Sequence, residues 1–234
     1  MPDQMIFNDR IEEGARTSAV TMQKWGGSAF FMMAVALIVA PSIYLVGDLR
    51  SAIGPITYSL ADFLYGPVWA ASLITGVFAL RERIGERASR RMNLAMLAAF
   101  VAAGAMVGVA CIRSANRYYH LTHPDLNLEM STTVLVVWAT LVAGVLATGW
   151  HFTGWVLILI GSAGWTSRRL PRSLSVLYLV TGASSLFVYV LPVMEGNSAA
   201  LSVILSIWQG ILLWKAKPGD VQTSERNTDH PDQA

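Results

Sequence analysis

The chain has 234 residues, of which 54% are hydrophobic and 14% are charged, and its net charge is +2. Soluble domains average about 25% charged residues, so this composition excludes an ordinary soluble globular protein. The basic residues gather in short segments between apolar stretches, which is a membrane-orientation signal and gives no support to a nucleic-acid partner. We predict an all-α fold, a polytopic membrane helix bundle, because lipid leaves backbone polar groups no partner outside helices.

Six long stretches almost free of charge are the predicted membrane-spanning helices, since about 20 apolar residues cross the hydrocarbon core. They cover residues 26–47, 60–80, 92–112, 131–166, 173–192 and 197–215. Together they form a transmembrane bundle over residues 26–216. Residues 1–25 are a polar cytoplasmic segment unlike a signal peptide, and residues 217–234 are expected to be a disordered cytoplasmic tail.

Prolines and small residues inside the spans predict how the helices pack. Pro41 and Pro67 fall inside the first two spans, where we expect each to bend its helix. The third span is dense in small residues, and the spacing of Gly104 and Gly108 permits a close approach between helices. We therefore expect the third span to lie centrally, with both glycines at a helix contact.

The fourth stretch, residues 131–166, is longer than a bilayer requires, since 36 residues of helix extend for about 54 Å. Either one long helix protrudes, or two short crossings meet near Gly149 and the bundle has seven spans. A single crossing places 14 of the 17 Lys and Arg residues on one side, all except Arg50, Arg113 and Arg117. Two crossings divide them 8 against 9. The positive-inside tendency therefore favours six spans in a bacterial inner membrane, with both termini cytoplasmic.

Aromatic residues agree with this orientation. Trp25, Trp165 and Trp214 all fall at the predicted cytoplasmic ends of spans, and indole rings favour the membrane interface. The basic segment 81–91 lies on the same side and can attract anionic lipid headgroups, as any topology-setting loop does.

The turn Leu170-Pro171-Arg172 follows one predicted span and precedes the apolar run Ser173–Phe187. Together with the closing run Ile207–Lys215, it resembles a bacterial family of six-helix integral membrane proteins catalogued as a domain of unknown function. The resemblance covers residues 130–216. It implies a six-helix fold and a membrane location, without an activity.

Charged residues near the ends of the second and third spans are the candidate ligand-binding site. Asp62 and Arg113 are expected at similar depth in antiparallel neighbours, where they can pair. Arg117 follows Arg113 by one helical turn and shares its helix face. Such a group is either a structural ion pair or the lining of a small-molecule site. If it binds a ligand, we expect an anion, because two arginines outnumber one carboxylate.

Histidines are the candidates for metal or haem binding. His120 and His123 lie near two acidic residues in a predicted loop, where they form either a transition-metal site or an ordinary solvated turn. His151 lies inside the fourth span as either an axial haem ligand or a hydrogen-bonded packing residue, and no facing second histidine is present. We expect no metal and no cofactor, because motifs for common cofactors are absent.

The expected function is that of a non-enzymatic membrane protein acting through contacts with membrane lipids, a ligand or a membrane partner protein, including a helix-mediated homo-oligomer. The alternative is a small-molecule transporter or sensor with an outward-facing polar site. A third interpretation, a membrane enzyme or haem protein, would depend on the three histidines.

Overall fold

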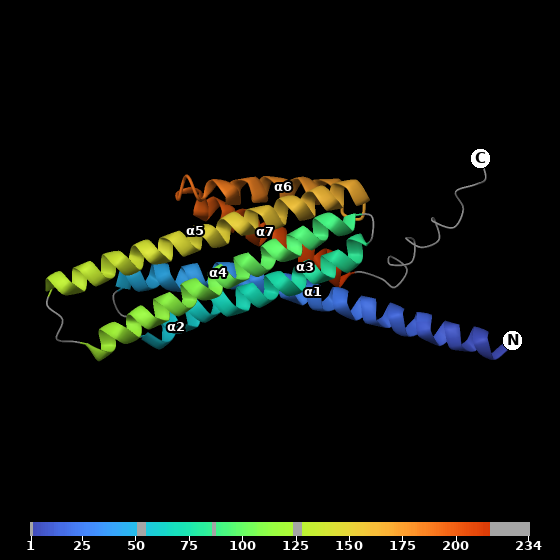
Figure 1. Cartoon of the computed structure of the whole chain (residues 1–234), viewed down its shortest axis with the longest axis horizontal. Helices are drawn as coiled ribbons and strands as arrows, with labels where there is room; N and C mark the ends of the chain where they lie inside the picture. The colour runs from blue at the N-terminus through green and yellow to red at the C-terminus, as the bar shows by residue number, and fades with distance from the viewer. Residues whose placement is uncertain (1, 51–54, 86–87, 124–127, 216–234) are drawn as a thin grey trace.

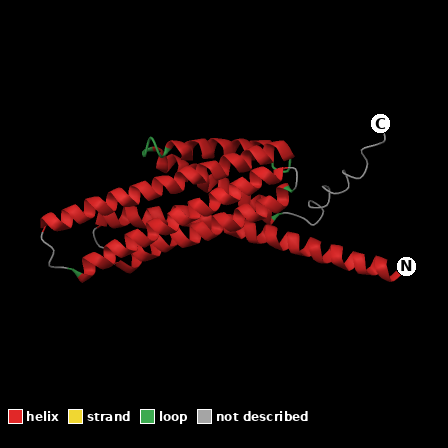
Figure 2. Cartoon of the chain, viewed as in Figure 1, coloured by secondary structure: helices red, strands yellow, loops and turns green. Residues whose placement is uncertain are grey.

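The computed structural model describes residues 2–50, 55–85, 88–123 and 128–215. Within these residues the chain is helical with short connections and no strand (Figure 2), so the prediction of an all-α bundle is confirmed. The helices are α1 (Pro2–Arg50), α2 (Pro55–Phe63), the π-helical turn η1 (Leu64–Val68), α3 (Trp69–Ile84), α4 (Ser89–Thr122), α5 (Leu128–Ser167), α6 (Arg172–Phe187) and α7 (Met194–Trp214). The predicted tail, residues 217–234, lies outside the described part of the chain.

The helices lie along one common long axis (Figure 1). α1 packs on α3 and α7, α4 packs on α3 and α5, and α5 packs on α6. α1 is continuous with the polar segment before the first predicted span and carries the N-terminus beyond the end of the bundle. α4 and α5 reach further than α6 at the opposite end. The bundle therefore has a short side, made by α6 and α7, and a long side.

Among the residues that the structure describes, five helical segments are long and apolar enough to cross a membrane, by length and composition. They are Val20–Val46, Thr57–Ile84, Ser89–Tyr119, Thr132–Ser167 and Met194–Trp214. The chain is thus a multi-pass membrane protein. α6 is the remaining helix of the bundle and has 16 residues. It ends five residues before the predicted span does, because Pro192 follows and disfavours helical backbone at the residue before it.

The fourth apolar stretch forms one unbroken helix, α5, of 40 residues, as expected for a single crossing. Gly149, the candidate break point, lies inside it and faces α4. A Cβ at Gly149 would lie 2.9 Å from the sulfur of Met106. The glycine therefore serves helix packing. At about 1.5 Å per residue, α5 extends for about 60 Å, twice the hydrocarbon thickness of about 30 Å.

Prolines affect two helices differently. Pro67 lies within the π-helical turn that joins α2 to α3, so the helix continues from Pro55 to Ile84 with one local change of hydrogen bonding. This is the disturbance expected of a residue without a backbone N–H. α1 continues through Pro41.

The prediction that Gly104 and Gly108 lie at a helix contact is wrong for Gly104, because a Cβ there would meet no atom within 4 Å. At Gly108 it would lie 3.7 Å from Val145, an ordinary contact. The close-packed face of α4 carries alanines instead, with Ala99 and Ala102 fully buried. The four-residue spacing places Gly104 and Gly108 on one face of α4, but it does not say whether that face meets another helix. Gly104 is exposed.

Candidate functional site

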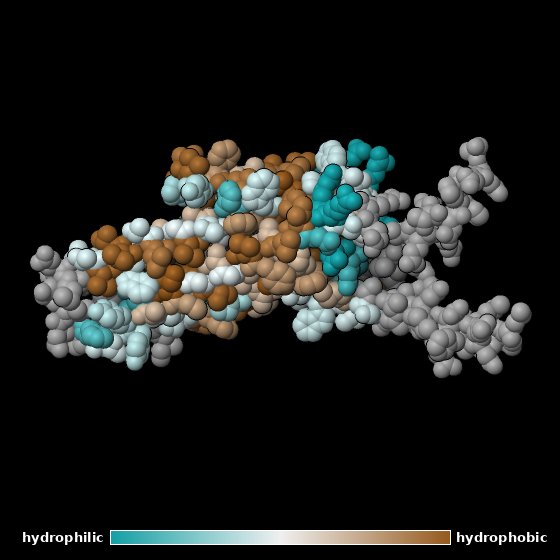
Figure 3. All heavy atoms as spheres, in the orientation of Figure 1, coloured by the Kyte–Doolittle hydropathy of each residue, from teal (hydrophilic) through white to brown (hydrophobic). Residues whose placement is uncertain are grey.

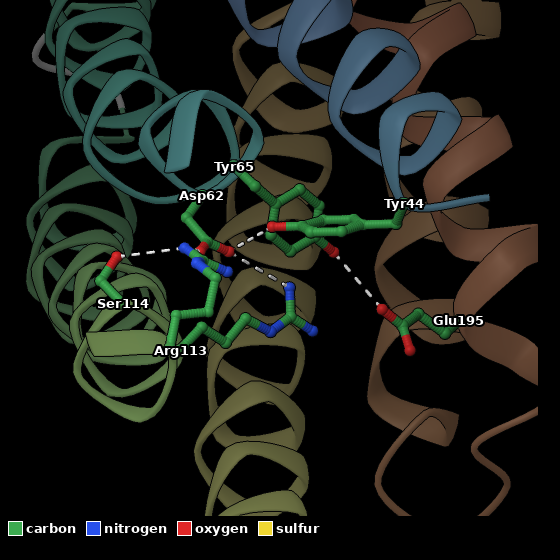
Figure 4. A network of polar contacts seen from close by, with 7 residues as sticks. Tyr44, Asp62, Tyr65, Arg113, Ser114 and Glu195 are labelled. Atoms are coloured by element: carbon green, nitrogen blue, oxygen red, sulfur yellow. Dashed lines mark hydrogen bonds and ion pairs between the residues drawn. The ribbon is translucent and has the colours of Figure 1, made fainter. Parts of the chain in front are cut away.

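Asp62, Arg113 and Arg117, the three residues predicted as a site, meet in the structure (Figure 4). The carboxylate of Asp62 accepts a hydrogen bond from the Arg117 guanidinium, and Nη1 of Arg113 lies 3.8 Å from its Oδ1. The Tyr44 hydroxyl on α1 donates a further hydrogen bond to Asp62. Asp62 is 2% exposed, so its charge is compensated inside the bundle by groups from α1 and α4.

Two tyrosine rings flank the arginines. The Arg113 guanidinium carbon lies 4.9 Å from the centroid of the Tyr44 ring, and that of Arg117 lies 6.0 Å from the Tyr58 centroid. The two rings stack on each other with centroids 6.2 Å apart. Each cation therefore has both a carboxylate and an aromatic ring nearby, an arrangement that holds a guanidinium in place.

A second carboxylate, that of Glu195 at the start of α7, lies near these residues (Figure 4). Its Oε1 accepts hydrogen bonds from the Tyr65 hydroxyl and from Nε1 of Trp150, each at 3.4 Å. Tyr65 follows Asp62 by one helical turn and lies beside it in Figure 4. We call the whole group the polar cluster: Tyr44, Tyr58, Asp62, Tyr65, Arg113, Arg117, Trp150 and Glu195. With Glu195 included, its arginines and carboxylates are equal in number, which corrects the expected excess of positive charge.

The aromatic members of the polar cluster were not predicted from the sequence. Tyr44, Tyr58 and Tyr65 lie near the ends of the first two spans, where aromatic rings with a polar group favour the membrane interface. This interfacial preference is the sequence signal that could have indicated the three tyrosines. It does not say which hydroxyl meets which carboxylate.

The polar cluster lies about one hydrocarbon thickness from the opposite end of the bundle. The separations are 19 residues each, from Trp25 to Tyr44 in α1, from Arg81 to Asp62 in α3 and α2, and from Trp214 to Glu195 in α7. At about 1.5 Å per residue this is about 28 Å, close to the roughly 30 Å of a hydrocarbon core. The exposed tryptophans and basic residues at one end and the polar cluster at the other are thus separated by about the thickness of a hydrocarbon core.

The polar cluster offers charge-assisted hydrogen bonds rather than a nucleophile paired with a base. Arg113 and Arg117 side chains are 27% and 23% exposed, whereas Asp62 is sealed. Part of each arginine side chain therefore remains accessible at the surface. The chemistry available is the binding of an oxyanion, with Asp62 holding the arginines from behind.

His151 and His123 make their hydrogen bonds and ring contacts with residues outside the polar cluster. Nε2 of His151 accepts a hydrogen bond from Nε1 of Trp155 at 3.2 Å, and its ring packs edge-on against Phe152 and Tyr189. His123 stacks on Tyr119 with centroids 4.5 Å apart. The side chain of His120 lies outside the described residues. Within the described ranges, no group of three or more His, Cys, Asp or Glu residues is close enough to hold a metal ion.

No protein-family model, curated protein or solved structure matches the chain. The resemblance around Leu170-Pro171-Arg172 therefore stays a prediction, and the polar cluster is interpreted from its own geometry.

Proposed function

We propose that this chain is a non-enzymatic protein of the bacterial cytoplasmic membrane that binds a small anionic ligand at the polar cluster, on the outer side of the bundle. The proposal includes six crossings, with α6 as the shortest, and both termini in the cytoplasm. The distribution of 14 of 17 basic residues on one side supports this orientation. A protein built this way acts as a sensor or as a binding subunit of a membrane assembly.

The observation that carries the proposal is the contrast in burial between the carboxylate and the arginines. Asp62 is 2% exposed and its two oxygens are occupied by Tyr44, Arg117 and Arg113. A guanidinium has five N–H donors in a planar fork suited to carboxylate or phosphate. Arg113 makes only a long contact with Asp62, so its donors are the more available for an incoming anion.

Arg113 and Arg117 therefore have different expected roles. Arg117 is hydrogen bonded to Asp62 and acts mainly as a structural ion pair, since its removal leaves a buried carboxylate short of a partner at a cost of about 3 kcal/mol. Arg113 is the expected ligand contact. Its loss is expected to destabilise the unliganded protein less than the loss of Arg117 does, because its contact with Asp62 is the longer of the two.

The experiment is a thermal-shift titration of the full chain in detergent with phosphate, acetate and succinate, at constant ionic strength set with chloride. An anion at 100 times its Kd raises the free energy of unfolding by about 2.7 kcal/mol. We expect Arg113→Gln to lose this response, and Arg90→Gln, an exposed arginine at the opposite end, to keep it. If none of the anions stabilises the protein, or if Arg113→Gln responds as the unchanged chain does, the proposed binding site is wrong.

A transporter is the second candidate, favoured by a row of buried polar residues on one face of α7. Ser198, Ser202, Ser206 and Gln209 continue from Glu195 toward the basic end. Ser198 contacts Ser184 of α6 at 2.8 Å, and the Ser202 and Ser206 hydroxyls have no hydrogen-bond partner among the described residues. Uptake of succinate into proteoliposomes, blocked by Ser202→Leu, would support transport. Absence of uptake by a correctly inserted protein would leave binding alone.

A further inference from the structure

A groove separate from the polar cluster opens at the basic end of the bundle, between α4, α5 and α6. Its volume is about 570 Å³. Arg91 at the start of α4, three residues at the end of α5 and two from α6 form its walls: Arg91, Ser162, Trp165, Thr166, Val176 and Leu179. Figure 3 shows hydrophilic residues gathered at this end of the molecule, directly beside the broad apolar band.

One end of the groove is cationic. Arg91 Nη1 donates hydrogen bonds to the Ser162 carbonyl oxygen at 3.0 Å and to Thr166 Oγ1 at 2.6 Å, which hold its guanidinium against α5. The Arg172 guanidinium carbon lies 5.9 Å from the centroid of the Trp165 ring. Arg91 of α4 thus lines the groove, and Arg172, in the first turn of α6, lies against the groove residue Trp165.

The rest of the groove is apolar and open to the membrane. Trp165 is 51% exposed and Val176 is 43% exposed. Arg172, Val176 and Leu179 are spaced by four and three residues, so they share one face of α6 and descend from the boundary into the hydrocarbon region. An exposed indole favours the interface between headgroups and acyl chains. The groove therefore changes from cationic to apolar along the direction in which a phospholipid lies.

No acidic residue of the groove helices neutralises this end. α4 and α6 contain neither Asp nor Glu, and the single one in α5 is Glu129, at the other end of that 40-residue helix. Within the described part of the chain, no carboxylate forms an ion pair with Arg91 or Arg172. The two cations are therefore available to a bound anion.

We infer that this groove binds one anionic phospholipid, with the headgroup phosphate between Arg91 and Arg172 and an acyl chain along Trp165, Val176 and Leu179. The inference uses the proposed orientation only to assign the lipid to the cytoplasmic leaflet. It does not depend on ligand binding at the polar cluster, and Arg91 and Arg172 are not part of that cluster.

The test is native mass spectrometry of the full chain in detergent, titrated with dioleoyl phosphatidylglycerol and, separately, with dioleoyl phosphatidylcholine. Each basic residue near a headgroup is expected to change affinity about fivefold. Arg172→Gln should therefore weaken phosphatidylglycerol binding about fivefold, and the double variant Arg91→Gln, Arg172→Gln on the order of 25-fold. Arg172 is chosen for the single variant because its side chain is exposed and its ring contact is with Trp165, which is also exposed.

The matched control is the double variant Arg81→Gln, Arg90→Gln, which removes two exposed charges from the same end without touching the groove. It should stay within about twofold of the unchanged chain. Val176→Trp fills the apolar part at constant charge and should weaken binding as the arginine variants do. The inference is overturned if the control loses as much affinity, if phosphatidylcholine binds equally well, or if Val176→Trp has no effect while inorganic phosphate displaces the lipid.

Discussion

Asp62 is the residue on which the polar cluster depends. A carboxylate that is 2% exposed near the edge of a membrane loses most of its hydration, and its partners must compensate for that loss. The structure supplies a tyrosine hydroxyl and two guanidinium groups, which come from helices on either side of α2. Because both guanidinium groups lie close to aromatic rings, the donors around Asp62 are held in place.

The stabilisation of Asp62 by the Tyr44 hydroxyl can be tested by removing that single oxygen atom. Tyr44→Phe keeps the ring under Arg113 and removes the hydrogen bond to Asp62, so we expect the free energy of unfolding to fall by about 1 to 3 kcal/mol. Tyr58→Phe is the control, since the contact of Tyr58 with Arg117 is made by its ring. Equal melting temperatures for the two variants in detergent would show that the Tyr44 hydroxyl does not stabilise Asp62.

At this scale the sequence predicted the charged residues better than their partners. Asp62 lies near the start of the second predicted span and Arg113 directly after the end of the third. In antiparallel neighbours these positions are at similar depth, which predicts a pair. Glu195 joins the cluster through Tyr65, which is 130 residues away in the sequence, and a contact of that separation depends on how the helices are arranged. No local pattern in one sequence contains that arrangement.

Among the helices, α5 shows what the distribution of charged residues predicts, and α4 shows what the spacing of small residues does not predict. Its length left one or two crossings open, and the distribution of basic residues correctly favoured one continuous helix. Gly104 in α4 was assigned to a contact from spacing alone, and it is exposed. A close contact between two glycines joins α5 and α6, where a Cβ on Gly154 or Gly182 would lie 2.8 Å from the other glycine's carbonyl oxygen. The spacing of glycines along a helix shows that another helix can approach closely. The packing of the folded chain shows where such a contact forms.

The two kinds of glycine give a matched prediction. Gly182→Ala places a methyl group against the backbone of α5, which must move, so we expect a loss of about 1 to 3 kcal/mol. Gly104→Ala adds a methyl group to open space and should leave stability unchanged or slightly raised. The stabilities of the two variants are compared by thermal melts in the same detergent. Similar losses for the two would contradict the packing described for α5 and α6.

The two halves of α5 differ in burial, which gives a second comparison between identical substitutions. Leu135 is 55% exposed and Leu157 is 3% exposed. Leu157→Ala should cost about 2 to 5 kcal/mol, because it opens a cavity against packed neighbours. Leu135→Ala should cost about 0.5 kcal/mol or less. If Leu135→Ala proves as damaging as Leu157→Ala in detergent-solubilised monomer, the first half of α5 is packed against something in solution.

For the whole molecule, the arrangement places two charged regions about one hydrocarbon thickness apart. The basic end carries the exposed tryptophans and the proposed lipid groove, and the other end carries the polar cluster. The membrane class and the helical bundle followed from composition and apolar stretches, because burial in lipid demands both. The specific ligand has no comparable signature, since binding depends on a few side chains whose geometry appears only after folding.

The most direct test of the central claim, an outward-facing polar cluster, is the accessibility of cysteines in intact spheroplasts. In a Cys111→Ala background, Ser114→Cys places a thiol on an exposed position beside Arg117, whose Nη2 lies 3.4 Å from the Ser114 hydroxyl. Arg90→Cys places one at the basic end. We predict that a membrane-impermeant maleimide labels Ser114→Cys in intact spheroplasts and labels Arg90→Cys only after lysis. Labelling of Arg90→Cys from outside, with Ser114→Cys protected until lysis, would contradict the orientation and with it the proposed outer ligand site.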